Sequence, residues 1–170
     1  VLPKVLSTSR SLVLDADALN AIAADPQLQT QLKARSGRSG RATVVTPHPL
    51  EAARLLACSS ADVQADRLGA AKALSERFRC VAVLKGSGSI TAEPGRLPVI
   101  NFTGNAKLAT AGTGDVLAGM IAARIAQGAP AFDAASQSVQ EHGQAADNWP
   151  AGRALTALLL ARQPEKEQPR

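Results

Sequence analysis

The chain has 170 residues, of which 45% are hydrophobic, and this is enough to bury one substantial core in a single globular unit. Nineteen Lys and Arg residues against fourteen Asp and Glu residues give a formal net charge of +5, which suits an anionic ligand such as a nucleotide or phosphate. Three Phe, one Trp and no Tyr leave little aromatic surface for stacking bases, so we expect no nucleic-acid partner.

The N-terminal segment from Val1 to Lys4 lacks the charged and then apolar pattern of a secretory signal. No window approaches the roughly 18 uninterrupted apolar residues of a membrane span, so we expect no membrane partner and a cytoplasmic location. Cys58 and Cys80 lack CxxC spacing and lie next to apolar runs, which predicts two buried free thiols. The basic stretch from Lys33 to Arg41, which includes Arg35 and Arg38, is typical of a solvated, flexible loop.

Three short apolar runs predict strands that are buried on both faces: Leu12 to Leu14, Thr43 to Val45 and Val81 to Leu84. Helical patterns lie between or beside them at about residues 27–34, 49–57 and 61–78. Because parallel strands need crossover connections of this kind, the sequence predicts an α/β fold with a mainly parallel sheet flanked by helices.

The second half of the chain is predicted to be mostly helical. A hairpin over residues 89–92 and 97–101 is followed by a helix from Val116 to Gln127, which ends before Gly128 and Pro130. Further helical patterns occupy residues 132–147 and 153–162. We predict one domain over residues 1–162 and a frayed tail over residues 163–170.

The strongest chemical signal is a glycine-rich loop that leads into a predicted helix. Asn101 to Asn105 is followed by residues 109–115 (ATAGTGD), which run into the helix at Val116. The glycines free the backbone to form an anion-binding nest, and the helix start offers unpaired N–H groups to a phosphate. Asp115 alone would be typical of a helix-start acid, but a base that must reach a hydroxyl beside a phosphate needs the close backbone approach that the glycines allow.

Three more polar groups follow predicted strands, where open α/β sheets place their ligands. Residues 85–89 (KGSGS) come after the third strand, although they also fit a hairpin turn with a surface lysine. His48, in residues 46–51 (TPHPLE), is held between two prolines, although an isolated loop histidine is usually inert. Asp15 and Asp17 follow the first strand, and Asp17 also fits a helix cap. Together these groups predict one cleft along one edge of the sheet.

Taken in order, five segments resemble the ADP-dependent NAD(P)H-hydrate dehydratases, a family with the ribokinase-like fold. They are residues 12–20 (LVLDADALN), 45–51 (VTPHPLE), 83–89 (VLKGSGS), 103–105 (TGN) and 109–119 (ATAGTGDVLAG). Their order and spacing, with the Thr-Pro-His-Pro segment, are more specific than the Gly-Thr-Gly-Asp motif that many ribokinase-like kinases share. The resemblance covers about residues 11–145.

The resemblance implies a role for each matching residue. Asp115 is implied to be the catalytic base and a substrate ligand, and His48 to contact the same substrate. No residue is assigned as a metal ligand, although Mg²⁺ is implied to assist. The phosphates of the adenine nucleotide are implied to be bound by Lys85, Gly86, Ser87, Gly88, Ser89 and Gly114.

The implied reaction removes water from the S epimer of hydrated NADH or NADPH. Asp115 deprotonates the substrate hydroxyl, which attacks the terminal phosphate of ADP; the ester then expels phosphate, leaving NAD(P)H and AMP. Since the family's domain has further strands and a glycine-containing loop before the first matched segment, we expect this chain to be the C-terminal portion of the domain. We also predict a homo-oligomer.

Two other functions stay open. A kinase of the same superfamily would phosphorylate a sugar, pyrimidine or thiazole alcohol with the same aspartate, and fold analogy does not exclude it. A catalytically incomplete nucleotide-binding module is the second alternative, although the presence of Asp115 argues against a decayed site.

Overall fold

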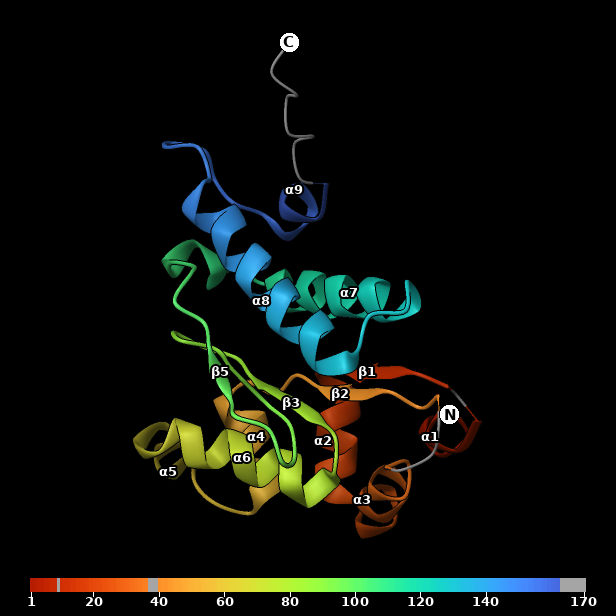
Figure 1. The fold of residues 1–170 in the computed structure, drawn as a ribbon. Coiled ribbons are helices and arrows are strands. Elements are labelled where there is room, and N and C mark those ends of the chain that lie inside the picture. The colour runs from red at the N-terminus through yellow and green to blue at the C-terminus, as the bar shows by residue number, and fades with distance from the viewer. Residues whose placement is uncertain (9, 37–39, 163–170) are drawn as a thin grey trace.

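The computed structural model describes residues 1–8, 10–36 and 40–162. Its centre is a five-stranded sheet in which each strand pairs with its sequence neighbours, in the order β1-β2-β3-β4-β5 (Figure 1). Strands β1, β2 and β3 are parallel, and β4 and β5 extend the sheet as an antiparallel hairpin. The bounds are β1 (Leu12–Leu14), β2 (Thr43–Val45), β3 (Val81–Leu84), β4 (Ile90–Ala92) and β5 (Val99–Ile100).

Side chains of the parallel strands alternate between two hydrophobic cores. Val45, Ala82 and Leu84 belong to the larger core, whereas Val44 and Val83 belong to a second core on the opposite face. This period of two is what a strand that is buried on both faces requires. The predicted α/β class, with a mainly parallel sheet between layers of helices, is confirmed.

Helices cover both faces of the sheet (Figure 1). The larger core is closed by α1 (Leu2–Thr8), α2 (Asp17–Ala24), α3 (Pro26–Lys33), α4 (Pro49–Leu56), α5 (Ser60–Ala65) and α6 (Arg67–Phe78). The second core is closed by α7 (Thr113–Ala126) and α8 (Ala131–Asp147), and α9 (Ala157–Arg162) contacts α7. A short 3₁₀ turn, η1 (Ala106–Leu108), precedes α7. No described helix is long and apolar enough to cross a membrane.

The predicted helices need four corrections. The single helix predicted over residues 61–78 is wrong, because Asp66 separates α5 from α6 and its carboxylate accepts a hydrogen bond from the Gly69 N–H at 2.8 Å. Helix α7 begins at Thr113 and not at Val116, so Asp115 lies inside its first turn. Helix α9 begins at Ala157, four residues later than predicted, and α1 was not predicted.

Two expectations about side-chain exposure are also wrong. Cys58 is exposed because it lies just past the end of α4, whereas Cys80 is buried and burial raises the pKa of its thiol to about 12. Arg35 is buried and not solvated: it donates to the carbonyl oxygens of Leu6 at 2.6 Å and Arg10 at 3.1 Å. The rest of that basic stretch at residues 37–39, and the predicted tail at 163–170, lie outside the described residues.

Candidate functional site

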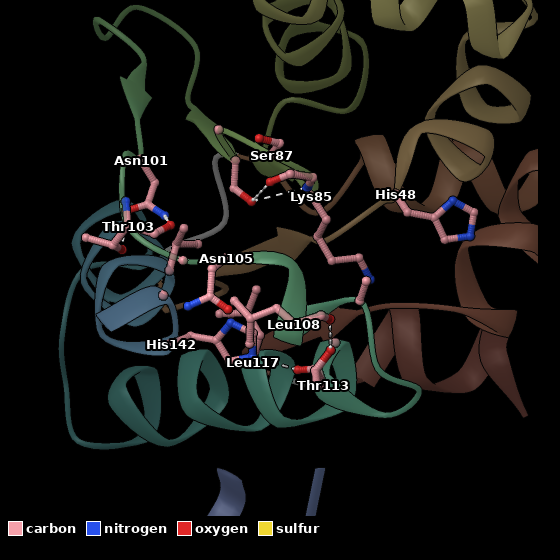
Figure 2. Close-up of a pocket in the computed structure, with 18 of the residues that line it drawn as sticks. His48, Lys85, Ser87, Asn101, Thr103, Asn105, Leu108, Thr113, Leu117 and His142 are labelled. Carbon is pink, nitrogen blue, oxygen red and sulfur yellow. Dashed lines mark hydrogen bonds between the residues drawn. The ribbon is translucent and has the colours of Figure 1, made fainter. Parts of the chain in front are cut away.

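A cavity of about 860 Å³ opens at the carboxyl end of β3 (Figure 2). Its wall is formed by the turn at Lys85–Ser89, by the segment from Asn101 to Ala109, by the start of α7, and by α8. His48 and Pro49 lie at its margin. A cleft at this edge of the sheet is therefore present, and it brings together segments that are far apart in the sequence. Asp15 and Asp17, which were predicted to belong to it, do not line it.

Arg67 stabilises the turn at Lys85–Ser89 through its guanidinium group. The Nη2 of Arg67 lies 3.4 Å from the carbonyl oxygens of Leu84 and Lys85 and 3.3 Å from that of Gly88. Within the turn, the Gly86 N–H donates to the Ser89 hydroxyl at 3.2 Å. A trans peptide directs its N–H opposite to its carbonyl, so the Gly88–Ser89 peptide turns its N–H away from the guanidinium. The sequence analysis did not identify Arg67.

The Lys85 side chain reaches back to the first strand. Its Nζ lies 2.6 Å from Oδ1 of Asp15, and both side chains are largely buried. The pair packs against the start of α7, because a Cβ at Gly114 would lie 3.3 Å from the Lys85 Nζ and 3.8 Å from Oδ2 of Asp15. A side chain at position 114 would therefore crowd this ion pair, which joins the ends of β1 and β3 to the first turn of α7.

The start of α7 combines a left-handed glycine with an exposed acid. Gly112 is the N-cap with φ +84°, a conformation that glycine adopts without strain. Thr113 is buried, and its hydroxyl donates to the carbonyl oxygen of Leu108 at 2.7 Å. Thr113 and Gly114 line the cavity, whereas Asp115 is exposed beside it. Gly114, which lines the cavity, and Asp115, which does not, are therefore neighbours in the first turn of one helix.

His48 caps α4. Its Nδ1 accepts hydrogen bonds from the N–H groups of Leu50 and Glu51 at 3.1 and 3.3 Å, and the Glu51 carboxylate accepts from the His48 N–H at 2.8 Å. This capping box leaves the His48 side chain 47% exposed at the cavity margin.

Asp17, in contrast to the prediction, does not cap α2. It is the first helical residue, and Ala16 is the N-cap with φ +50°.

Helix α8 supports the segment that follows β5. The Thr103 hydroxyl donates to the carbonyl oxygen of Gln140 at 2.9 Å, and the Gly104 N–H donates to the Asp147 carboxylate at 2.8 Å. This close approach depends on Gly143, where a Cβ would lie only 2.6 Å from the carbonyl carbon of Thr103 and 2.7 Å from its oxygen.

His142 is a cavity residue that the sequence analysis missed. It is buried in α8, and its Nε2 lies 2.9 Å from the carbonyl oxygen of Thr113 in α7 (Figure 2). Burial lowers the pKa of the imidazole, and the contact with the Thr113 carbonyl opposes this in part. The available signal was the pair His142-Gly143 inside a helical pattern, because a glycine within a helix often marks close packing.

Gly143→Ala is expected to force the Thr103 segment out of the cavity wall, because the added Cβ would lie 2.6 Å from backbone. The affinity for ADP, which the family resemblance leads us to expect in this cavity, should fall by at least about tenfold. Gly119→Ala is the matched control, since a Cβ at Gly119 in α7 meets nothing within 4 Å. It should stabilise the protein by about 0.5–1 kcal/mol and leave binding unchanged. Calorimetric titration with ADP and thermal unfolding measure both; equal affinities of the two variants would contradict the prediction.

The layered helices, the mainly parallel sheet and the glycine-rich segments around a cavity at its carboxyl edge have the arrangement of the ribokinase-like fold. A family model described as NAD(P)H-hydrate dehydratase matches residues 1–168. The chain belongs to this family.

Two known proteins of this kind are similar to the chain in sequence. The chain is 43% identical over 154 residues to the ADP-dependent (S)-NAD(P)H-hydrate dehydratase of Neisseria meningitidis, covering 91% of this chain and 50% of that protein. It is 45% identical over 147 residues to the bifunctional NAD(P)H-hydrate repair enzyme Nnr of Escherichia coli, covering 86% and 26% of the two chains.

A crystal structure of the ADP/ATP-dependent NAD(P)H-hydrate dehydratase from Bacillus subtilis, co-crystallised with ATP/Mg²⁺, superposes with a TM-score of 0.73 at 29% identity, covering 93% of this chain and 54% of that one. The chain therefore spans about half the length of these single-activity relatives, and less of the bifunctional one.

Proposed function

We propose that this chain carries the nucleotide-binding and base-bearing portion of an ADP-dependent (S)-NAD(P)H-hydrate dehydratase, which returns hydrated NADH or NADPH to the reduced cofactor. One observation carries the proposal: the turn at Lys85–Ser89 and the first turn of α7 face the same cavity, with the exposed carboxylate of Asp115 beside it. A cavity of about 860 Å³ has the size of a small-molecule site.

In the proposed complex, ADP lies in the cavity with its phosphates between the glycine-rich turn and the start of α7. The N–H groups at the helix start and the positive end of the helix dipole favour an anion there. Gly114 allows the phosphates to approach the backbone closely, and the ammonium of Lys85, which is paired with Asp15, lies next to Gly114. The nucleotide roles of Lys85, Gly86, Ser87, Gly88, Ser89 and Gly114 are part of this proposal.

Asp115 acts on the open side of the helix start. Its carboxylate takes the proton of the substrate hydroxyl as that oxygen bonds to the terminal phosphorus of ADP, and the bond between this phosphorus and the bridging oxygen breaks to release AMP. Phosphate is a far better leaving group than hydroxide. The C–O bond of the phosphate ester then breaks and phosphate departs with the bonding electrons. A proton passes from the neighbouring ring carbon to water, and the C=C bond of the dihydronicotinamide is restored.

Mg²⁺ is expected to accompany the nucleotide. The described residues hold no group of three or more His, Cys, Asp or Glu side chains arranged around a metal position. We propose that the ion would be held largely through the phosphates of the nucleotide, as is common for nucleotide-dependent enzymes. When bound, the ion would neutralise charge on the phosphates.

The direct test is to incubate the chain with the S epimer of hydrated NADH and ADP, and to follow the dihydronicotinamide absorbance. Recovery of NADH with stoichiometric AMP and phosphate supports the proposal. A parallel panel of sugar, pyrimidine and thiazole alcohols with ATP tests the kinase alternative. Phosphorylation of one of these alcohols without NADH recovery would replace the proposal, and ADP binding without turnover of any substrate would favour an incomplete nucleotide-binding module.

His48 is proposed to contact the hydrated nicotinamide, and its replacement should separate substrate use from nucleotide binding. His48→Asn keeps a side-chain acceptor for the first turn of α4, whereas His48→Ala removes it and should cost about 0.5–2 kcal/mol of stability. Both variants should raise the KM for the hydrate while leaving the Kd for ADP unchanged. Loss of ADP affinity alone, with the hydrate KM preserved, would refute the assignment.

A further inference from the structure

The contact between His142 and Thr113 determines which nitrogen of the buried imidazole carries hydrogen. Nε2 lies 2.9 Å from a carbonyl oxygen, which only accepts hydrogen bonds, so Nε2 must be the donor. Burial lowers the pKa of His142 and favours the neutral ring. The neutral ring with hydrogen on Nε2 leaves Nδ1 as a pure acceptor.

The Nδ1 of His142 remains accessible from the cavity. Among the described residues it makes no hydrogen bond. The fully buried side-chain polar atoms that lack a partner belong to Ser136, Ser138 and Trp149. Nδ1 of His142 is not one of them, so this nitrogen keeps some exposed surface. Since His142 lines the cavity, a bound molecule can reach this nitrogen.

Two aliphatic side chains line the cavity close to this acceptor. Leu117 lies one turn after Thr113 on α7, and Val139 lies one turn before His142 on α8; both line the cavity and pack in the same core. The nearby Asn105 amide is already used, because its Nδ2 donates to the Ala146 carbonyl oxygen at 2.9 Å and its Oδ1 accepts from the Lys107 N–H at 3.0 Å. This end of the cavity therefore combines two aliphatic side chains with one unused acceptor.

We propose that this end of the cavity binds the purine base of the nucleotide, and that His142 Nδ1 accepts a hydrogen bond from the exocyclic 6-amino group. His142 is then a specificity-determining residue for a 6-aminopurine. A 6-oxopurine in the same position would set a carbonyl oxygen against the Nδ1 lone pair, and a purine without a 6-substituent would leave Nδ1 unpaired. The inference rests on the proposed function only in that a nucleotide occupies the cavity.

The test compares the Kd of ADP with that of purine riboside diphosphate, which lacks the 6-amino group, by calorimetry. The unaltered chain should prefer ADP by about 3- to 10-fold, the value of one neutral hydrogen bond. His142→Leu should reduce this ratio to about one. Val139→Ala, which removes apolar surface from the same wall, should weaken both nucleotides equally and keep the ratio.

A second measurement does not depend on the folding of a variant. The chain has only two histidines, so the ¹⁵N signals of both imidazoles can be followed in the unaltered protein. ADP should shift the Nδ1 signal of His142, and purine riboside diphosphate should leave it in place. His48, whose Nδ1 already accepts from the start of α4, provides the internal reference.

The outcomes separate the two proposals. Equal affinities for the two nucleotides, an unchanged ratio in His142→Leu, or no difference between the nucleotides at the Nδ1 signal would overturn the base contact while leaving the nucleotide site in place. Failure of the unaltered chain to bind either nucleotide would overturn both proposals.

Discussion

Asp115→Asn is expected to lower turnover of the hydrated cofactor by about 10²–10⁴-fold, while the fold and the ADP affinity are retained. Asn has nearly the same size as Asp and keeps a polar side chain in the first turn of α7, but it has no carboxylate to accept the proton of the substrate hydroxyl. Because Asp115 is exposed beside the cavity and does not line it, the Kd for ADP should change little.

Asp133→Asn is the matched control for this variant. Asp133 is also an acid in the first turn of a long helix, α8, where it pairs with Arg96 at 2.9 Å. If Asp115 only stabilised the start of α7, both variants would lose about 0.3–1 kcal/mol of stability and neither would lose much activity. Near-normal NADH recovery by folded Asp115→Asn would remove the proposed base.

Arg35→Ala is expected to destabilise the chain by about 3–5 kcal/mol, because it deprives several acceptors of their donor at about 1–3 kcal/mol each. Its guanidinium donates to the carbonyl oxygens of Leu6 and Arg10, and its Nε donates to the Thr43 hydroxyl at 3.0 Å. Arg35 thereby joins α1 and the chain before β1 to the neighbouring strand β2. Urea unfolding followed by circular dichroism measures the loss.

Arg41→Ala provides the comparison within the same basic stretch. Arg41 makes one exposed hydrogen bond, to the carbonyl oxygen of Ser7 at 2.9 Å, so its loss should cost about 0.5 kcal/mol or less. Similar unfolding midpoints for the two variants would show that burial of Arg35 contributes little.

The strands were the most predictable part of the fold. Each of the parallel strands is a short apolar run bounded by turn residues, and a strand buried on both faces leaves that mark in the sequence without help from distant residues. Glycine positions were similarly informative, since Gly112 is left-handed and Gly114 packs against an ion pair.

Features that depend on tertiary contacts could not be predicted. The sequence places Arg35 in a stretch that is typical of a solvated loop. In the structure its guanidinium donates to the carbonyl oxygens of Leu6 and Arg10, which are distant in the sequence. The uninterrupted helical pattern over residues 61–78 hides the break at Asp66, where a side-chain cap starts a new helix. His142 becomes recognisable only when α8 lies against α7.

The candidate site was also predicted only in part. His48, Gly114 and the turn at Lys85–Ser89 line one cavity, as strand-end placement leads one to expect. The partner of Lys85 was not predictable, because Asp15 is distant in the sequence. The chemical roles of these residues, and that of Asp115, stay predictions for the assays above.

The order of the strands has a consequence for how the site is made during synthesis. Since each strand pairs only with its sequence neighbours, the sheet can be assembled strand by strand as the chain leaves the ribosome. The cavity cannot form so early, because its far wall consists of α7 and α8, which follow β5 in the chain (Figure 1). We therefore expect ADP to bind only after these helices have docked, so that the nucleotide stabilises the last stage of folding and has no effect on the first.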